Sequence, residues 1–176
     1  MLAKLCEQLG VRRALVLDHF SLRSATSLSK ICDTVVVTNP DMEEKTLTLG
    51  KCEVFIRPVW LREFLDSRST SMVGLLLTHQ GFGCMFLDFQ SQLFSHKNTH
   101  SDIKDSLESL DFGNYNQGAV FAVTLCKTRG GCSPTASLAL ILAFIKDAGL
   151  LGECLHELSE GSVVTQIFIV RKAFAF

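Results

Sequence analysis

Short, wholly apolar runs recur along this chain and alternate with segments of helical periodicity. The first run, residues 14–18, ends on Asp18, and the second, Thr34–Thr38, leads into Asn39. A strand that is covered on both faces of a sheet has no polar side, so such runs are typical of parallel strands in α/β proteins. Ligands of these sheets bind at the carboxyl ends of the strands. The pattern therefore predicts a binding site close to Asp18 and Asn39.

The same alternation continues to the end of the chain. The expected strands are residues 14–18, 34–38, 52–56, 84–89 and 119–125, followed by 153–158 and 166–174 around a turn at 159–162. The expected helices are residues 4–10, a segment from Ser21 or Ser24 to Cys32, and residues 60–66, 71–78, 102–110 and 135–147. Ser133 is expected to cap the last helix, with Pro134 at its first position.

Composition narrows the class of protein. The 176 residues suit a single domain, 1–176, and 47% of them are hydrophobic, which is too apolar for a disordered chain. The longest apolar stretch, residues 136–145, is too short to cross a bilayer, so no membrane contact is expected. Seventeen Lys and Arg against eighteen Asp and Glu give a net charge of −1. This balance does not direct the protein to nucleic acid or to an anionic membrane.

The cysteines indicate a reducing compartment. Their number is odd at seven, they are scattered, and no C-x-x-C pair occurs. Thiols set inside apolar runs fit buried, reduced side chains better than a disulfide framework. We therefore expect an intracellular, cytoplasmic protein, while the Arg pair near the N-terminus leaves an organellar location open.

Five βα steps followed by two closely spaced strands complete the predicted order. This order, from ALVLD through CMFLDF to the tail GECLHELSEGSVVTQIFIVRKAF, resembles the class I S-adenosylmethionine-dependent methyltransferases. The resemblance implies a Rossmann-like three-layer α/β sandwich, whose mostly parallel sheet has its last strand antiparallel between two neighbours. It also implies S-adenosylmethionine as the cofactor.

Individual positions follow from this resemblance. ALVLD resembles the family's first strand, whose loop approaches the methionine part of the cofactor. The end of VVVTN resembles the position whose acid binds the ribose hydroxyls. CMFLDF resembles the fourth-strand motif, whose Asp lies beside cofactor and substrate. The side chains expected at the cofactor site are Asp18, His19, Phe20, Asn39, Asp88 and Phe89. No catalytic residue is assigned, because methyl transfer relies mainly on positioning.

Two departures from the family pattern matter. No glycine occurs between Asp18 and Gly50, so the usual glycine-rich turn is replaced by HFSLRSA. Either this loop swings wider and Ser21 or Ser24 supplies hydroxyl contacts in place of backbone amides, or Phe20 and Leu22 fill the pocket and exclude the cofactor. Asn39 stands where the family has an acid, although its amide oxygen can still accept a hydrogen bond from a ribose hydroxyl.

Each candidate also has a purely structural interpretation. Asp18 can cap the following helix, and Asn39 before Pro40 is common turn chemistry. Asp88 is the strongest candidate, because a carboxylate that closes an apolar strand needs solvent or a partner. His96 and His100 lie in an expected loop without a third ligand, so no metal is predicted.

Two classes of function remain open. The first is a methyltransferase with an unidentified methyl acceptor, for which the near-neutral charge does not favour nucleic acid, protein or small molecule. The second is an inactive methyltransferase-like scaffold that acts through protein or ribonucleoprotein contacts. The missing glycines and the apolar C-terminal AFAF favour the scaffold, whereas the overall order of elements favours the enzyme.

Overall fold

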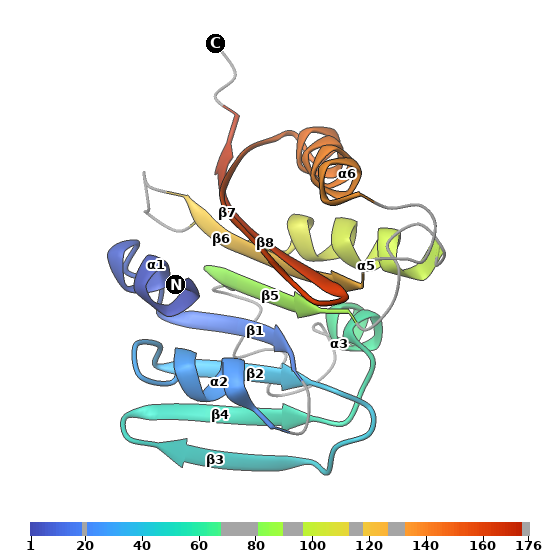
Figure 1. Cartoon of the computed structure of the whole chain (residues 1–176). Coiled ribbons are helices and arrows are strands. Elements are labelled where there is room, and N and C mark those ends of the chain that lie inside the picture. The colour runs from blue at the N-terminus through green and yellow to red at the C-terminus, as the bar shows by residue number, and fades with distance from the viewer. Residues whose placement is uncertain (19–20, 68–80, 90–96, 113–117, 127–132, 174–176) are drawn as a thin grey trace.

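Eight strands form one sheet in the order β3-β4-β2-β1-β5-β6-β8-β7, with helices on both faces (Figure 1). The computed structural model describes residues 1–18, 21–67, 81–89, 97–112, 118–126 and 133–173. The strands are β1 (Arg13–Leu17), β2 (Thr34–Thr38), β3 (Lys45–Leu49), β4 (Cys52–Arg57), β5 (Cys84–Asp88), β6 (Ala119–Cys126), β7 (Leu150–Glu160) and β8 (Val163–Lys172). The helices are α1 (Leu2–Gln8), α2 (Arg23–Leu28), α3 (Leu61–Ser67), α5 (Lys97–Glu108) and α6 (Pro134–Asp147).

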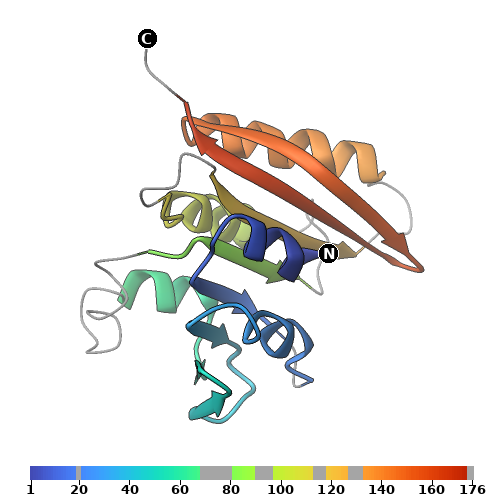
Figure 2. The same ribbon diagram turned by 90° about the vertical axis from the view of Figure 1, so that its left-hand side faces the viewer.

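The pairing of the strands confirms the predicted fold class. Strands β4, β2, β1, β5 and β6 are parallel. Strand β8 is antiparallel to both β6 and β7 and lies between them. In chain order, β7 therefore takes the edge of the sheet first, and β8 then takes the position between β7 and β6. Figure 2 shows β7 and β8 as a long two-stranded hairpin beneath α6.

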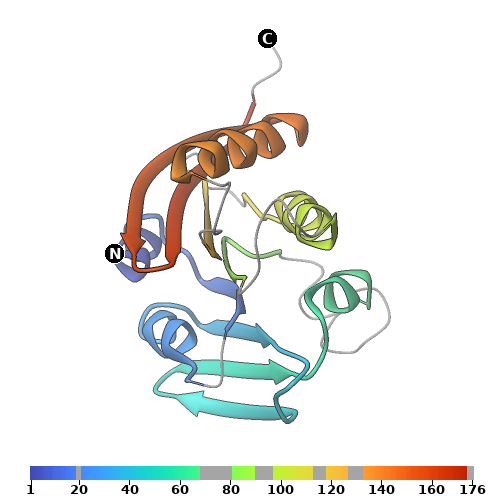
Figure 3. The ribbon, with the colours of Figure 1, turned by 45° about the vertical axis from the view of Figure 1, so that its right-hand side comes forward.

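The sheet separates two hydrophobic layers (Figure 3). Helices α3, α5 and α6 cover one face, where Phe82, Phe121 and Phe168 are completely enclosed. Helices α1 and α2 cover the other face through residues such as Cys6 and Leu28. Coverage of both faces explains why the central strands read as continuous apolar runs. No helix within the described ranges is long and apolar enough to cross a membrane.

The second predicted βα step has no helix in the described structure. Strands β2 and β4 are parallel neighbours, and the segment between them forms β3, an antiparallel edge strand paired with β4. The expectation of five βα steps is therefore wrong at this step, because a hairpin takes the place of the crossover helix. Strand β3 is exposed along most of its length, so it lacks the apolar run that marks the central strands.

Two helices differ from the sequence prediction by several residues at one end. Helix α2 ends at Leu28 instead of Cys32, and α5 begins at Lys97 instead of residue 102. Helix α1 is followed by Gly10, whose φ of 65° fits its predicted role as a helix stop. Ser133 caps α6 as predicted, since its hydroxyl accepts a hydrogen bond of 3.1 Å from the Ala136 backbone N–H. The predicted helix at residues 71–78 lies outside the described residues.

Candidate functional site

Three of the predicted site residues come from neighbouring strands. Asn39 follows β2, Asp18 follows β1, and Asp88 ends β5. Because β2, β1 and β5 are adjacent and parallel, the carboxyl ends of all three lie at one edge of the sheet. This is the edge at which ligands of open α/β sheets bind. His19 and Phe20 lie outside the described residues.

Asp18 caps helix α2 from outside the helix. Its side chain is only 6% exposed, and Oδ2 accepts a hydrogen bond of 3.0 Å from the Ala25 backbone N–H. The residue at the N-cap position is Leu22, which has a left-handed φ of 49° and offers no side-chain acceptor. The expected cap by Ser21 or Ser24 is therefore wrong, because a carboxylate from the preceding strand end satisfies this N–H instead.

Asn39 joins the ends of β1 and β2. Its Nδ2 donates a hydrogen bond of 2.8 Å to the Asp18 carbonyl oxygen, and its Oδ1 accepts one of 2.9 Å from the Asp41 N–H. These bonds give Asn39 the turn role that the sequence also allowed. An amide oxygen has two lone pairs, so Oδ1 retains the capacity for one further hydrogen bond.

Asp88 and Phe89 close strand β5 in different environments. Asp88 is partly exposed at the strand end, in register with Thr124 of β6. Phe89 is 7% exposed and packs into the core beneath α3 and α5, while its N–H donates to the Thr124 carbonyl oxygen. The buried Phe89 side chain therefore anchors the end of β5, next to the partly exposed Asp88.

Sequence reasoning missed Thr38 and Trp60 at this edge. The Thr38 hydroxyl is completely buried at the end of β2, and its oxygen has no hydrogen-bond partner among the described residues. An unpaired buried hydroxyl lowers the stability of the folded protein by about 1–3 kcal/mol, so its presence requires an explanation. Trp60 follows β4 and is 62% exposed, and its backbone N–H donates a hydrogen bond of 3.2 Å to the Glu63 carboxylate. The sequence signal for Thr38 was a threonine at the end of an apolar strand.

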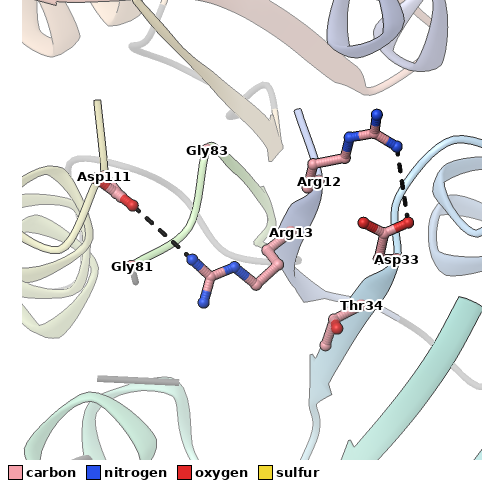
Figure 4. A pocket seen from close by; sticks show the side chains of 7 residues that line it. All are labelled: Arg12, Arg13, Asp33, Thr34, Gly81, Gly83 and Asp111. Atoms are coloured by element: carbon pink, nitrogen blue, oxygen red, sulfur yellow. Dashed lines mark ion pairs between the residues drawn. The ribbon is translucent and has the colours of Figure 1, made fainter. Parts of the chain in front are cut away.

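The opposite, amino-terminal edge of the sheet contains a cavity of about 350 Å³. Figure 4 shows Arg13 reaching across it towards Asp111, while Arg12 points towards Asp33. The two ion pairs are long, at 3.9 Å and 3.8 Å. Gly81 also lines the cavity, where a Cβ atom would stand 2.3 Å from the Asp111 Cβ. This cavity was not predicted and lies away from the carboxyl edge.

Burial disfavours the reactive thiolate form of two cysteines, Cys32 and Cys84. Burial raises the pKa of the Cys32 thiol to about 12. A hydrogen bond with Cys6, together with burial, also raises the pKa of Cys84, so both thiols stay protonated. Within the described ranges, no three His, Cys, Asp or Glu side chains are grouped to hold a metal ion. His100 belongs to α5 instead of the predicted loop, and its ring packs 5.2 Å from that of Phe144.

Similarity to known proteins is confined to structure. No protein-family model and no curated protein sequence matches the chain. A complex of Trm1 from Pyrococcus horikoshii with S-adenosyl-L-methionine superimposes with a TM-score of 0.65 and 11% identity, over 97% of this chain and 53% of that one. The chain thus spans about half the length of Trm1.

Two further solved structures match over nearly their whole length. An rRNA methylase from Streptococcus thermophilus gives a TM-score of 0.60 and 9% identity, over 98% of this chain and 94% of the other. The N-methyltransferase NodS from Bradyrhizobium japonicum gives 0.57 and 10%, over 98% and 93%. With its antiparallel β8 between β6 and β7, the chain has the fold of the class I S-adenosylmethionine-dependent methyltransferases.

Proposed function

We propose that this protein is an S-adenosylmethionine-dependent methyltransferase, acting as one domain over residues 1–176. The observation that carries the proposal is the sheet order, in which antiparallel β8 lies between β6 and β7. Similar structures include NodS in complex with S-adenosyl-L-homocysteine, the product left when the cofactor has lost its methyl group. The methyl acceptor is not identified.

The proposed cofactor site occupies the carboxyl edge of β2, β1 and β5. Asp18, His19, Phe20, Asn39 and Asp88 would hold the cofactor there, while Phe89, predicted with them, would support Asp88 from the core. The residues fit a ligand with several hydroxyl and amino groups, because carboxylate, amide and hydroxyl oxygens are concentrated at this edge. The unpaired Thr38 hydroxyl supports the same assignment, since a bound polar group is one way to satisfy it.

Asp88 is the residue proposed to contribute most to binding. When bound, the cofactor supplies an electrophilic methyl group on a sulfonium, and transfer forms a bond from methyl carbon to acceptor while the carbon–sulfur bond breaks. The chain's task is then to orient the two reactants, which is worth several kcal/mol of barrier without a catalytic side chain. Asp88 suits this role because a partly exposed carboxylate can make charge-assisted hydrogen bonds to a ligand.

An inactive scaffold is the second candidate. It is favoured by the absence of glycine between Asp18 and Gly50, and by the hydrogen bonds that already engage the Asp18 carboxylate and the Asn39 amide. Leu22 packs against the core on the α2 face, which shows one apolar side chain of this loop turned inward. A protein or ribonucleoprotein partner would then replace the methyl acceptor.

Calorimetric titration with S-adenosylmethionine and S-adenosylhomocysteine separates these candidates. The enzyme proposal expects the wild-type protein to bind both. Asp88→Ala should weaken binding by about 1–3 kcal/mol, which is roughly 5- to 150-fold, through the loss of a charge-assisted hydrogen bond. Asp147→Ala, an exposed acid at the end of α6, is the matched control and should bind like the wild type.

Two results would contradict these expectations. Failure of the folded wild-type protein to bind either compound would reject the enzyme and favour the scaffold. Unchanged binding by Asp88→Ala would reject the assignment of this residue. Thermal melting of each variant verifies that the fold is retained.

A further inference from the structure

A larger cavity, of about 620 Å³, lies on the α2 side of the amino-terminal edge. Helix α2 and the segment that follows it form one wall, and the turn between β3 and β4 forms the other. The lining residues include Arg12, Thr26, Ser29, Lys30, Asp33 and Lys51. The hairpin that replaces the crossover helix between β2 and β4 therefore borders a hollow instead of a packed helix.

The charge of this cavity differs from that of the whole chain. The described residues that line it include three basic side chains, Arg12, Lys30 and Lys51, and one acidic side chain, Asp33. The chain as a whole has a net charge of −1. Neither lysine forms an ion pair with another described residue. The Arg12–Asp33 contact is 3.8 Å long with the side chains 66% and 65% exposed, and such pairs contribute little. All three cations are therefore available to an external anion.

The positions of these cations suit a row of anions better than one. Arg12 directly precedes β1 and Lys51 directly precedes β4, with β2 between them. Strands lie about 4.8 Å apart, so the two side chains start roughly 10 Å from each other. The cavity also shares Arg12 and Asp33 with the smaller one that Arg13 lines, which extends the same edge towards β5 (Figure 4).

We propose that this amino-edge groove, formed by Arg12, Lys30 and Lys51 with the hydroxyls of Thr26 and Ser29, binds the phosphodiester backbone of single-stranded nucleic acid. A flexible strand can follow the edge from one cavity to the next, whereas a short duplex is a rigid rod. No aromatic side chain of the described chain lines either cavity, so the contacts are electrostatic and do not read the base sequence. The proposal is independent of cofactor binding.

Fluorescence anisotropy with a labelled 12-nucleotide oligouridine, measured without cofactor, tests the groove. Lys30→Ala/Lys51→Ala should weaken binding about tenfold at low salt. Because each phosphate contact on a single strand contributes about 0.7 to the slope of log K against log salt, the slope should fall by about 1.4. Asp33→Asn should strengthen binding, since it removes the only acid among the described residues that line the larger cavity.

Control measurements distinguish this groove from the protein's other basic side chains. Lys146→Ala, an exposed lysine in the last turn of α6, should leave affinity and slope unchanged. Oligothymidine should bind within about threefold of oligouridine, because a backbone contact does not need the 2′-hydroxyl. All four replaced side chains are at the surface, so each variant should melt like the wild type.

Three results would overturn the proposal. The first is wild-type affinity and salt slope in the Lys30→Ala/Lys51→Ala protein. The second is a strong preference for RNA or for DNA, which would mean that sugar or base contacts dominate. The third is displacement of the labelled oligonucleotide by polyglutamate at a much lower concentration of charge than by unlabelled oligouridine, which would identify the groove as a surface for an acidic protein segment.

Discussion

Replacing Asp18 by alanine tests how the loop after β1 is fixed. The Ala25 N–H lies in the first turn of α2 and is buried, and the Asp18 carboxylate is its acceptor at 3.0 Å. Loss of an N-terminal cap costs about 1 kcal/mol, and loss of a negative charge near a helix N-terminus adds roughly 0.3–1 kcal/mol. Together, these two contributions should lower the free energy of unfolding by about 2 kcal/mol. For a chain of this size, that lowers Tm by about 4–8 °C.

Asp18→Asn is the matched variant, because its amide oxygen can still accept the bond while the charge is lost. It should lose only the charge contribution, about 0.3–1 kcal/mol. The Asn39 bond goes to the Asp18 backbone carbonyl, so both variants leave it intact. Urea unfolding followed by circular dichroism gives the free energies. The capping role is refuted if Asp18→Ala is as stable as the wild type, or if both variants lose the same amount.

Three further outcomes are expected from the structure. Burial raises the pKa of the Cys32 thiol to about 12. The stability that the protonated thiol contributes is therefore complete below about pH 9 and is lost progressively from there to about pH 12, by about 1 kcal/mol at pH 10. Cys32→Ala should flatten this part of a urea-unfolding pH profile. Gly118→Ala should lower Tm strongly, because φ is 101° and the new Cβ would lie 2.5 Å from the Val170 carbonyl oxygen. Ser133→Ala should cost about 1 kcal/mol in chemical denaturation through the lost cap, whereas Ser133→Asp should not.

Most of the fold could be predicted from the sequence, because burial on both faces leaves a strong apolar signature in β1, β2, β5 and β6. Strand β3 was missed for the opposite reason. It pairs on one side only, and Lys45, Thr46 and Thr48 face solvent, so the pattern resembles that of a polar loop. The start of α5 was missed because its first turn carries no apolar residue before Ile103.

The candidate site could be located from the sequence but not described in detail. Asp18, Asn39 and Asp88 were placed at one edge because they end strands that proved to be adjacent. The hydrogen bonds of Asp18 to Ala25 and of Asn39 to Asp41 depend on how the chain turns, which composition does not encode. The amino-edge groove combines residues from three segments, and no one of these segments alone carries a signal for it.

The placement of β8 between β6 and β7 sets an order of assembly during synthesis. Strand β7 emerges first but has no partner on β6, because β8 occupies that position. At a synthesis rate of about 5–20 residues per second, the 23 residues from Leu150 to Lys172 take roughly 1–5 s to appear. During that time, the Gln166 and Phe168 positions beside β6 are empty, and β6 is a temporary sheet edge. An incomplete chain that stops within β8 would retain this edge, which is the kind of surface through which nascent chains aggregate.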